Sequence, residues 1–197
     1  MSLPPSSATR KKIHSRSIIL DGWKREDGLW DIEARLIDVK HHDYPLSTGL
    51  RRKGEALHEM QIRITVDWHL NIRDAVASFG ATPYPGACDA VAPAYRKIIG
   101  LNLARGFRRA VNDLFGGTLG CSHLTELLSS LPSAAIQTLG SEVSETEGAI
   151  PGQQPFQLDR CHALATTSET VRCYYPRWYR GPQMDGTETM DDSSPKK

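Results

Sequence analysis

The side chains best able to do chemistry in this sequence are cysteines and histidines on separate segments. Thiolates and imidazoles together are suited to zinc or an iron-sulfur centre rather than to magnesium or calcium. Because no C-x-x-C pair is present, the fold would have to gather the ligands of such a site. The candidate metal ligands are His58, Cys88, Cys121, His123, Cys161 and His162.

Two of these residues, Cys121 and His123, lie at the beginning of a predicted helix. Unpaired amides and the helix dipole favour an anion such as a thiolate at that position. An imidazole two residues further on could be a second ligand or a general base. Cys121 and His123 are therefore also the candidate catalytic residues. The alternative is that Cys121 is a small buried apolar residue and that His123 is a capping or surface side chain.

The other candidates depend on how their own segments fold. Cys88 lies in the Gly- and Pro-rich loop ATPYPGACDAVAP, and such loops often carry function. His58 points to the core by the period-two pattern of LHEMQIRI, where a histidine is usually a hydrogen-bonded core residue. Its place at the beginning of the strand would nevertheless let it reach a site at the end of the sheet. If LDRCHAL is extended, Cys161 and His162 point to opposite faces, so only one of them could enter a given site.

Alternating apolar and polar residues predict two β-hairpins. Residues 16–24 and 29–40 form the first predicted pair of strands, with a turn between them, and residues 57–66 and 70–79 form the second. Each hairpin has one apolar face and one face exposed to solvent. The two pairs together predict a sheet of four antiparallel strands.

Helical spacing follows the strands. Apolar residues at intervals of three and four predict a helix over about 95–115 and a second helix with Ser122 as its N-cap, broken or kinked at Pro132. Residues 156–165 and 170–175 are predicted to be short strands. The expected fold class is α+β: an antiparallel sheet of two hairpins, plus short C-terminal strands, covered by two main helices.

The length of 197 residues suits one domain. Residues 1–14 and 182–197 are rich in Ser, Pro and charge, so we expect them to be disordered tails. Residues 140–155 are acidic and carry Gly and Pro, and they predict a long loop inside a single domain over 15–181.

Composition narrows the class of protein. Lys plus Arg (24) nearly cancels Asp plus Glu (23), which argues against nucleic-acid binding. No run approaches the roughly 18 apolar residues of a membrane span, and no apolar stretch follows the basic start, so we expect a cytoplasmic protein. The usual phosphate-loop, dinucleotide, H-E-x-x-H and G-x-S-x-G motifs are absent.

Several stretches together resemble a bacterial family known as domain of unknown function 2889. They are LDGWKREDGLWDIEARLIDVK, LHEMQIRITVD, GCSHLTELL and LDRCHAL followed by YYPRW. The resemblance spans about residues 15–179, and GCSHLTELL is its most specific piece. It implies that LDRCHAL belongs to the same domain, and it brings no established activity.

A weaker likeness is to iron-sulfur scaffold proteins of the IscU and NifU type. In that family, too, a strand similar to MQIRITVD leads into a hairpin, then into a Cys-bearing loop like that of Cys88, and then into helices. The last of these helices starts near a cysteine like Cys121. Where that family has its first cysteine, this sequence has residues 54–57 and then His58. The likeness therefore implies a fold more than a cofactor.

Three functions remain open from the sequence. The first is metal binding, to zinc or an iron-sulfur centre, through the thiols and imidazoles named above. The second is a metal-free enzyme of lyase, isomerase or hydrolase type acting on a small organic or aromatic acid. In that enzyme Cys121 or His123 would be the acid, base or nucleophile, and Arg35 or Arg63 would hold the carboxylate. The third is a non-catalytic partner or assembly protein.

Overall fold

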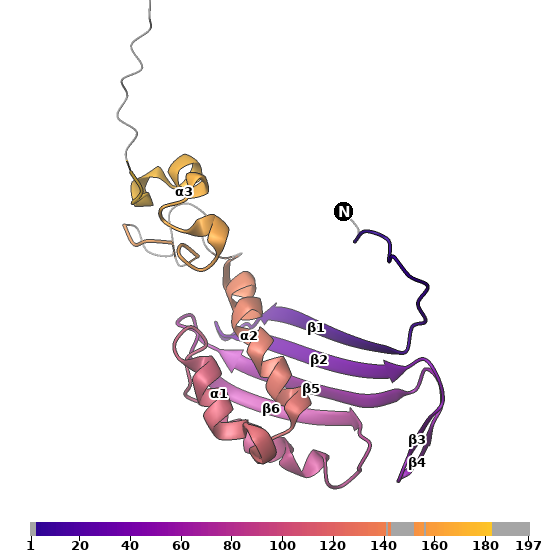
Figure 1. The fold of residues 1–197 in the computed structure, drawn as a ribbon. Helices are drawn as coiled ribbons and strands as arrows, with labels where there is room; N and C mark the ends of the chain where they lie inside the picture. The colour runs from indigo at the N-terminus through magenta and orange to yellow at the C-terminus, as the bar shows by residue number, and fades with distance from the viewer. Residues whose placement is uncertain (1–2, 141, 143–151, 156, 183–197) are drawn as a thin grey trace, which may run out of the picture. The chain divides into compact units, whose positions relative to one another are not determined.

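The computed structural model describes residues 3–140, 142, 152–155 and 157–182 (Figure 1). Its contacts group into two compact units, Met1–Ser141 and Glu142–Lys197, and each unit is described by itself. Residues 183–197 of the predicted C-terminal tail and most of the predicted acidic loop lie outside the described residues. The single domain predicted over 15–181 stays a prediction.

The first unit is built on a four-stranded antiparallel sheet in the order β1-β2-β5-β6 (Figure 1). Strands β1 and β2 form one hairpin, β5 and β6 form the other, and β2 pairs with β5 to join them. Both predicted hairpins are confirmed. A small second sheet, β3 paired with β4, lies in the chain between β2 and β5. The bounds are β1 His14–Lys24, β2 Trp30–Lys40, β3 Tyr44–Leu46, β4 Gly49–Arg51, β5 Ala56–Val66 and β6 Ile72–Ala81.

Two helices, α1 (Phe107–Phe115) and α2 (Ser122–Gly140), lie on one face of this sheet (Figure 1). The predicted cover of two main helices is thus confirmed, and α2 continues through Pro132. Apolar residues of both helices pack on the inward residues of the strands and form one core. Burial of this shared apolar surface is what holds the two layers together.

The long helix predicted over 95–115 is wrong in its first half. Residues Asp89–Ile98 form the 3-10 helix η1, and α1 begins only at Phe107. Gly100 and Gly106 separate the two with φ of 88° and 66°, in the left-handed region that glycine enters without strain. A second short 3-10 helix, η2 (Gly117–Leu119), follows α1.

The second unit is helical in its described part. It holds η3 (His162–Leu164), α3 (Glu169–Tyr174) and η4 (Pro176–Trp178) around a small core that includes Val171. The predicted C-terminal strands are wrong: residues 157–165 form turns and η3, and 170–174 lie in α3. The Ser168 hydroxyl accepts a hydrogen bond from the Val171 amide at 3.2 Å, and this N-cap starts a helix where short apolar spacing suggested a strand.

Within the described part of the chain, no helix is both long enough and apolar enough to cross a bilayer.

Candidate functional site

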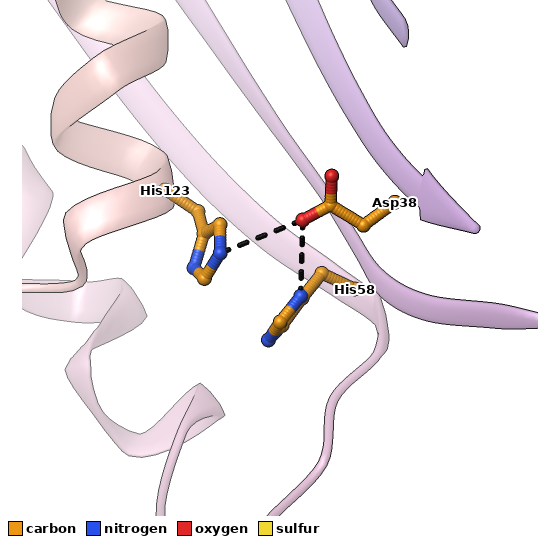
Figure 2. Close-up of side chains that lie close together, drawn as sticks. All are labelled: Asp38, His58 and His123. Carbon is orange, nitrogen blue, oxygen red and sulfur yellow. Dashed lines mark hydrogen bonds and ion pairs between the residues drawn. The ribbon is translucent and has the colours of Figure 1, made fainter. Parts of the chain in front are cut away.

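A carboxylate and two imidazoles converge near the end of β2, the beginning of β5 and the first turn of α2. Figure 2 shows His58 and His123 approaching the same oxygen of Asp38. Nδ1 of His58 lies 3.1 Å from Asp38 Oδ2, and Nε2 of His123 lies 3.5 Å from it. One ligand atom from each of the three residues falls within 4.8 Å of the other two. The imidazole rings lie 4.0 Å apart between centroids.

The sheet register places the first two of these side chains opposite each other. Inward residues of β2 alternate along the strand, and Asp38 continues that buried series after Leu36. Asp38 pairs with Arg16 on β1 and with His58 on β5, so these three residues form one row across three strands. The next pair is Val39 with Ala56, which leaves Leu57 as a β-bulge beside the row. Bulges of this kind are common next to functional sites because they redirect a side chain.

Asp38 is almost fully buried, at 2% exposure, and its charge is compensated by a neighbouring cation. Arg16 donates from Nε to Oδ1 and from Nη2 to Oδ2, both at 2.8 Å, and Nε2 of His14 lies 3.0 Å from Oδ1. Arg16 also pairs with Glu126 of α2. Burial by itself raises the pKa of Asp38, but the bonds and charge of Arg16, with those of His14, outweigh it and hold that pKa well below the usual range. Asp38 is therefore ionised at neutral pH.

The two imidazoles are held in the neutral form. Burial is the main cause that lowers the pKa of His58, and the hydrogen bond that His58 makes to the Asp38 carboxylate only partly offsets it. Burial also lowers the pKa of His123, assisted by the charges of His58 and Arg16. A neutral imidazole keeps one nitrogen lone pair, which can bind a metal ion or accept a proton.

The beginning of α2 is fixed by a tyrosine from η1. The Tyr95 hydroxyl accepts a hydrogen bond from the Cys121 amide at 2.9 Å and donates one to the Cys121 carbonyl at 3.0 Å. The Tyr95 ring stacks on Phe115 with centroids 4.3 Å apart. A helix begins here as predicted, but the predicted N-cap is one residue too late. Ser122 is the first residue of α2, and the carbonyl of Cys121 accepts the first helical hydrogen bond, from the Thr125 amide at 2.9 Å.

Cys121 also contacts the imidazole of the site. Its Sγ lies 3.9 Å from Nδ1 of His123, whose other nitrogen faces Asp38. The thiol of Cys121 thus contacts the imidazole of His123, which in turn contacts the carboxylate of Asp38. This order of groups is typical of enzymes that use a cysteine nucleophile.

A cavity of about 430 Å³ opens beside the imidazoles. Its polar lining includes His58, Cys88, Cys121 and His123, and much of the remaining wall is apolar. The small β3–β4 sheet and its turn are hydrogen-bonded to the loop after β6, which lines one side of the cavity. The Thr48 hydroxyl donates to the Pro83 carbonyl at 2.7 Å, and Arg51 donates to the Thr82 carbonyl at 3.0 Å.

Four of the six residues predicted as metal ligands therefore line one cavity, namely His58, Cys88, Cys121 and His123. Cys161 and His162 belong to the second unit, where Cys161 is exposed and His162 begins η3. Their predicted participation in the site stays a prediction.

The arginines predicted to hold a carboxylate lie on the outward face of the sheet. Arg35 pairs with Glu59, and Arg63 lies 3.6 Å from Glu33. Neither arginine lines the cavity beside the imidazoles. A ligand in that cavity would have to be held by other groups.

Asp38 was missed in the sequence, although a signal for it exists. The alternation that places Trp30, Ile32, Ala34 and Leu36 in the core also places the carboxylate of Asp38 there. An acidic residue at an inward strand position has to be paired, because burying an unpaired charge is costly. That requirement would have pointed to a polar cluster at this end of the sheet.

A family model described as a protein of unknown function (DUF2889) matches residues 14–137. The match begins at the first residue of β1 and includes every side chain of the Asp38 cluster. It ends before the LDRCHAL segment, so the predicted membership of that segment in the same domain stays a prediction. No match was found among curated proteins or among solved structures. The likeness to iron-sulfur scaffold proteins also stays a prediction.

Proposed function

The chain belongs to the DUF2889 family of proteins of unknown function, and we propose that it binds a divalent metal ion through Asp38, His58 and His123. The observation that carries the proposal is the convergence of these three side chains, from three different elements, on one point. Two nitrogen donors and one oxygen donor suit zinc or a similar first-row ion. An iron-sulfur cluster requires thiolates, which this set of three residues does not supply.

The spacing of the donor atoms supports an ion between them. Two ligand atoms that are each about 2.0–2.1 Å from a tetrahedral zinc stand roughly 3.3 Å apart. The distances from Asp38 Oδ2 to His58 Nδ1 and to His123 Nε2, 3.1 and 3.5 Å, lie on either side of that value. The two imidazole nitrogens lie within 4.8 Å of each other, so the rings would move together until all three donors contact one ion. Because both imidazoles are neutral, binding shifts a ring proton to the other nitrogen rather than expelling a charge.

The surrounding charges support the same conclusion. Asp38 and Glu126 are negative and share the single positive charge of Arg16, so this group keeps an excess of negative charge. A divalent cation neutralises that excess. Arg16 and His14 also fix the orientation of the Asp38 carboxylate, which is the usual task of residues behind a metal ligand.

The proposed centre has the form of a catalytic site rather than a closed structural one. Three protein ligands leave at least one coordination position open, and both imidazoles also line the cavity. An ion with an open position can activate a water molecule or polarise a substrate oxygen. We therefore propose a metal-dependent reaction on a small molecule in this cavity.

The metal proposal is tested by the metal content of protein purified without chelator. We expect about one ion per chain in the wild type and less than about a tenth of that in the Asp38→Asn and His58→Ala variants. His69→Ala is the matched control, because His69 lies in the exposed turn between β5 and β6. A folded wild-type protein without metal that does not take up added zinc would overturn the proposal.

The line from Cys121 through His123 to Asp38 favours a second candidate, a metal-free enzyme with Cys121 as nucleophile. The test is the rate of iodoacetamide labelling of each cysteine in chelator-treated protein, followed by peptide mass spectrometry. This candidate predicts that Cys121 reacts faster than the exposed Cys161 and loses that advantage in the His123→Ala variant. Labelling of Cys121 at or below the rate of Cys161 would exclude it.

A further inference from the structure

We infer that the ligand of this cavity is a small monoanion, with one anionic oxygen head that binds the metal and an uncharged apolar body. The inference rests on the proposed metal site and adds the chemical class of the molecule that it receives. It follows from three properties of the cavity, namely the polar and apolar side chains of its lining, its charge and its size.

The cavity lining contains both polar and apolar side chains. His58 and His123, two of the proposed ligands, and Cys121 supply nitrogen and sulfur atoms, and Thr82, Thr118 and Ser122 add hydroxyl groups. The apolar lining includes Met60 of β5, Phe79 of β6, Pro83 and Tyr84 of the following loop, and Val91 of η1. A ligand that satisfies both parts has a single polar head and an apolar body that can pack on aromatic rings.

The charge of the lining limits the ligand to one charged group. Among the described residues that line the cavity, none is Asp, Glu, Lys or Arg. Of the charges that act on the imidazoles, those of Asp38 and Glu126 both pair with Arg16, and the ammonium group of Lys40 lies over the Tyr44 ring. The metal would neutralise one anionic head. A second charge on the body would lose its hydration without gaining a partner, which is strongly unfavourable.

The volume indicates a body of about one ring. A cavity of about 430 Å³ falls in the lower part of the range of roughly 300–1,000 Å³ for small-molecule sites. A benzene molecule occupies an apolar cavity of about 150 Å³. A six-membered ring with its head group therefore fits, and the described lining contains no Lys or Arg to pair with a phosphate group.

Three hydroxamates with the same metal-binding head test the inference on cobalt-loaded protein, in which ligand binding changes the visible spectrum. Benzohydroxamate is expected to bind about tenfold or more tightly than acetohydroxamate, because its ring buries apolar surface. The compound 4-carboxybenzohydroxamate is expected to bind about tenfold or more weakly than benzohydroxamate, because its second charge has no partner. Equal affinity for all three, or a preference for the doubly charged compound, would overturn the inference.

A variant that places a cation in the apolar lining provides a gain-of-function test. Val91→Arg is expected to raise the affinity for 4-carboxybenzohydroxamate relative to benzohydroxamate by about tenfold. Val76→Arg is the matched control, because Val76 lies on the outward face of β6 and lines a different surface. An equal change of selectivity in the two variants would contradict the assignment of the ligand to this cavity.

The two proposals fail in different ways. A protein that takes up neither cobalt nor zinc overturns both, because the ligand class depends on the ion. A protein that binds one ion per chain but does not discriminate among the hydroxamates leaves the metal site standing and removes only the ligand class.

Discussion

Replacing Asp38 by asparagine tests whether the buried carboxylate holds the end of the sheet together. Asparagine keeps the size of the side chain but loses its charge and puts an NH₂ group in place of one acceptor oxygen. Arg16 donates to both oxygens of Asp38, so one of its bonds would meet a donor instead of an acceptor. The guanidinium of Arg16 would then be left without its main counter-ion.

The expected loss can be worked from the burial of the pair. Removing one partner of a buried ion pair costs about 3–5 kcal/mol. Arg16 is 30% exposed and keeps Glu126 as a second partner, so the lower limit of about 3 kcal/mol applies. With an m-value of about 2 kcal/mol per molar urea, this loss lowers the unfolding midpoint by about 1.5 M.

The assay is urea unfolding in the presence of chelator, so that metal binding does not contribute to the difference. Asp74→Asn is the matched control, because Asp74 pairs with Arg96 at 3.2 Å on the surface, with both side chains more than half exposed. An exposed pair of this kind contributes about 0–1 kcal/mol. If Asp38→Asn lowers the free energy of unfolding no more than Asp74→Asn does, with unchanged m-values, the reasoning from burial is refuted.

Two further predictions use the same unfolding assay. In chelator-treated protein we expect the free energy of unfolding to fall as the pH drops from about 7 towards 5. The pKa values of His58 and His123 in the folded protein lie below the ordinary value of about 6.5. The unfolded chain therefore binds more protons than the folded chain in that pH range. The depressed pKa of Asp38 lowers the free energy of unfolding further only below about pH 4. If the stability of a His58→Gln variant depended on pH between 7 and 5 as strongly as that of the wild type, the role given to the histidines would be contradicted. Gly22→Ala is expected to cost about 1–3 kcal/mol, because its Cβ would lie 1.9 Å from Thr138 Oγ1, and Thr138→Ala should restore part of that loss. A Gly22→Ala chain as stable as the wild type would show that β1 and α2 do not pack as described.

The sequence predicted a strand or helix correctly where one hydrophobic pattern, either alternation or helical spacing, continues along the whole element. The strands of both hairpins follow from alternation, and the beginning of α2 follows, to within one residue, from its apolar spacing. The prediction over 95–115 failed because apolar spacing continued across Gly100 and Gly106, whose left-handed conformation interrupts the helix. The C-terminal strands failed because short apolar runs fit a strand and a short helix equally well.

The candidate site could be predicted only in the part that local sequence determines. Cys121 was placed correctly just before a helix and His123 in its first turn, because a helix start is a local feature. The pairing of Asp38 with His58 depends on the register between two separate hairpins and on the bulge at Leu57. Neither follows from the residues of one strand, since such register is set by contacts distant in the sequence.

The bulge at Leu57 also separates the regular ladder that holds Asp38 from the β3–β4 segment that contacts the cavity loop. On one side of it, the regular ladder fixes Asp38 opposite His58 and thereby fixes the proposed ion. On the other side, the chain forms the small β3–β4 sheet, which contacts the cavity loop through Thr48 and Arg51. Substitutions and length changes in that sheet would alter the loop beside the cavity and leave the pairing of Asp38 with His58 in the ladder unchanged. The cavity rim and the Asp38 row are therefore independent targets for redesign.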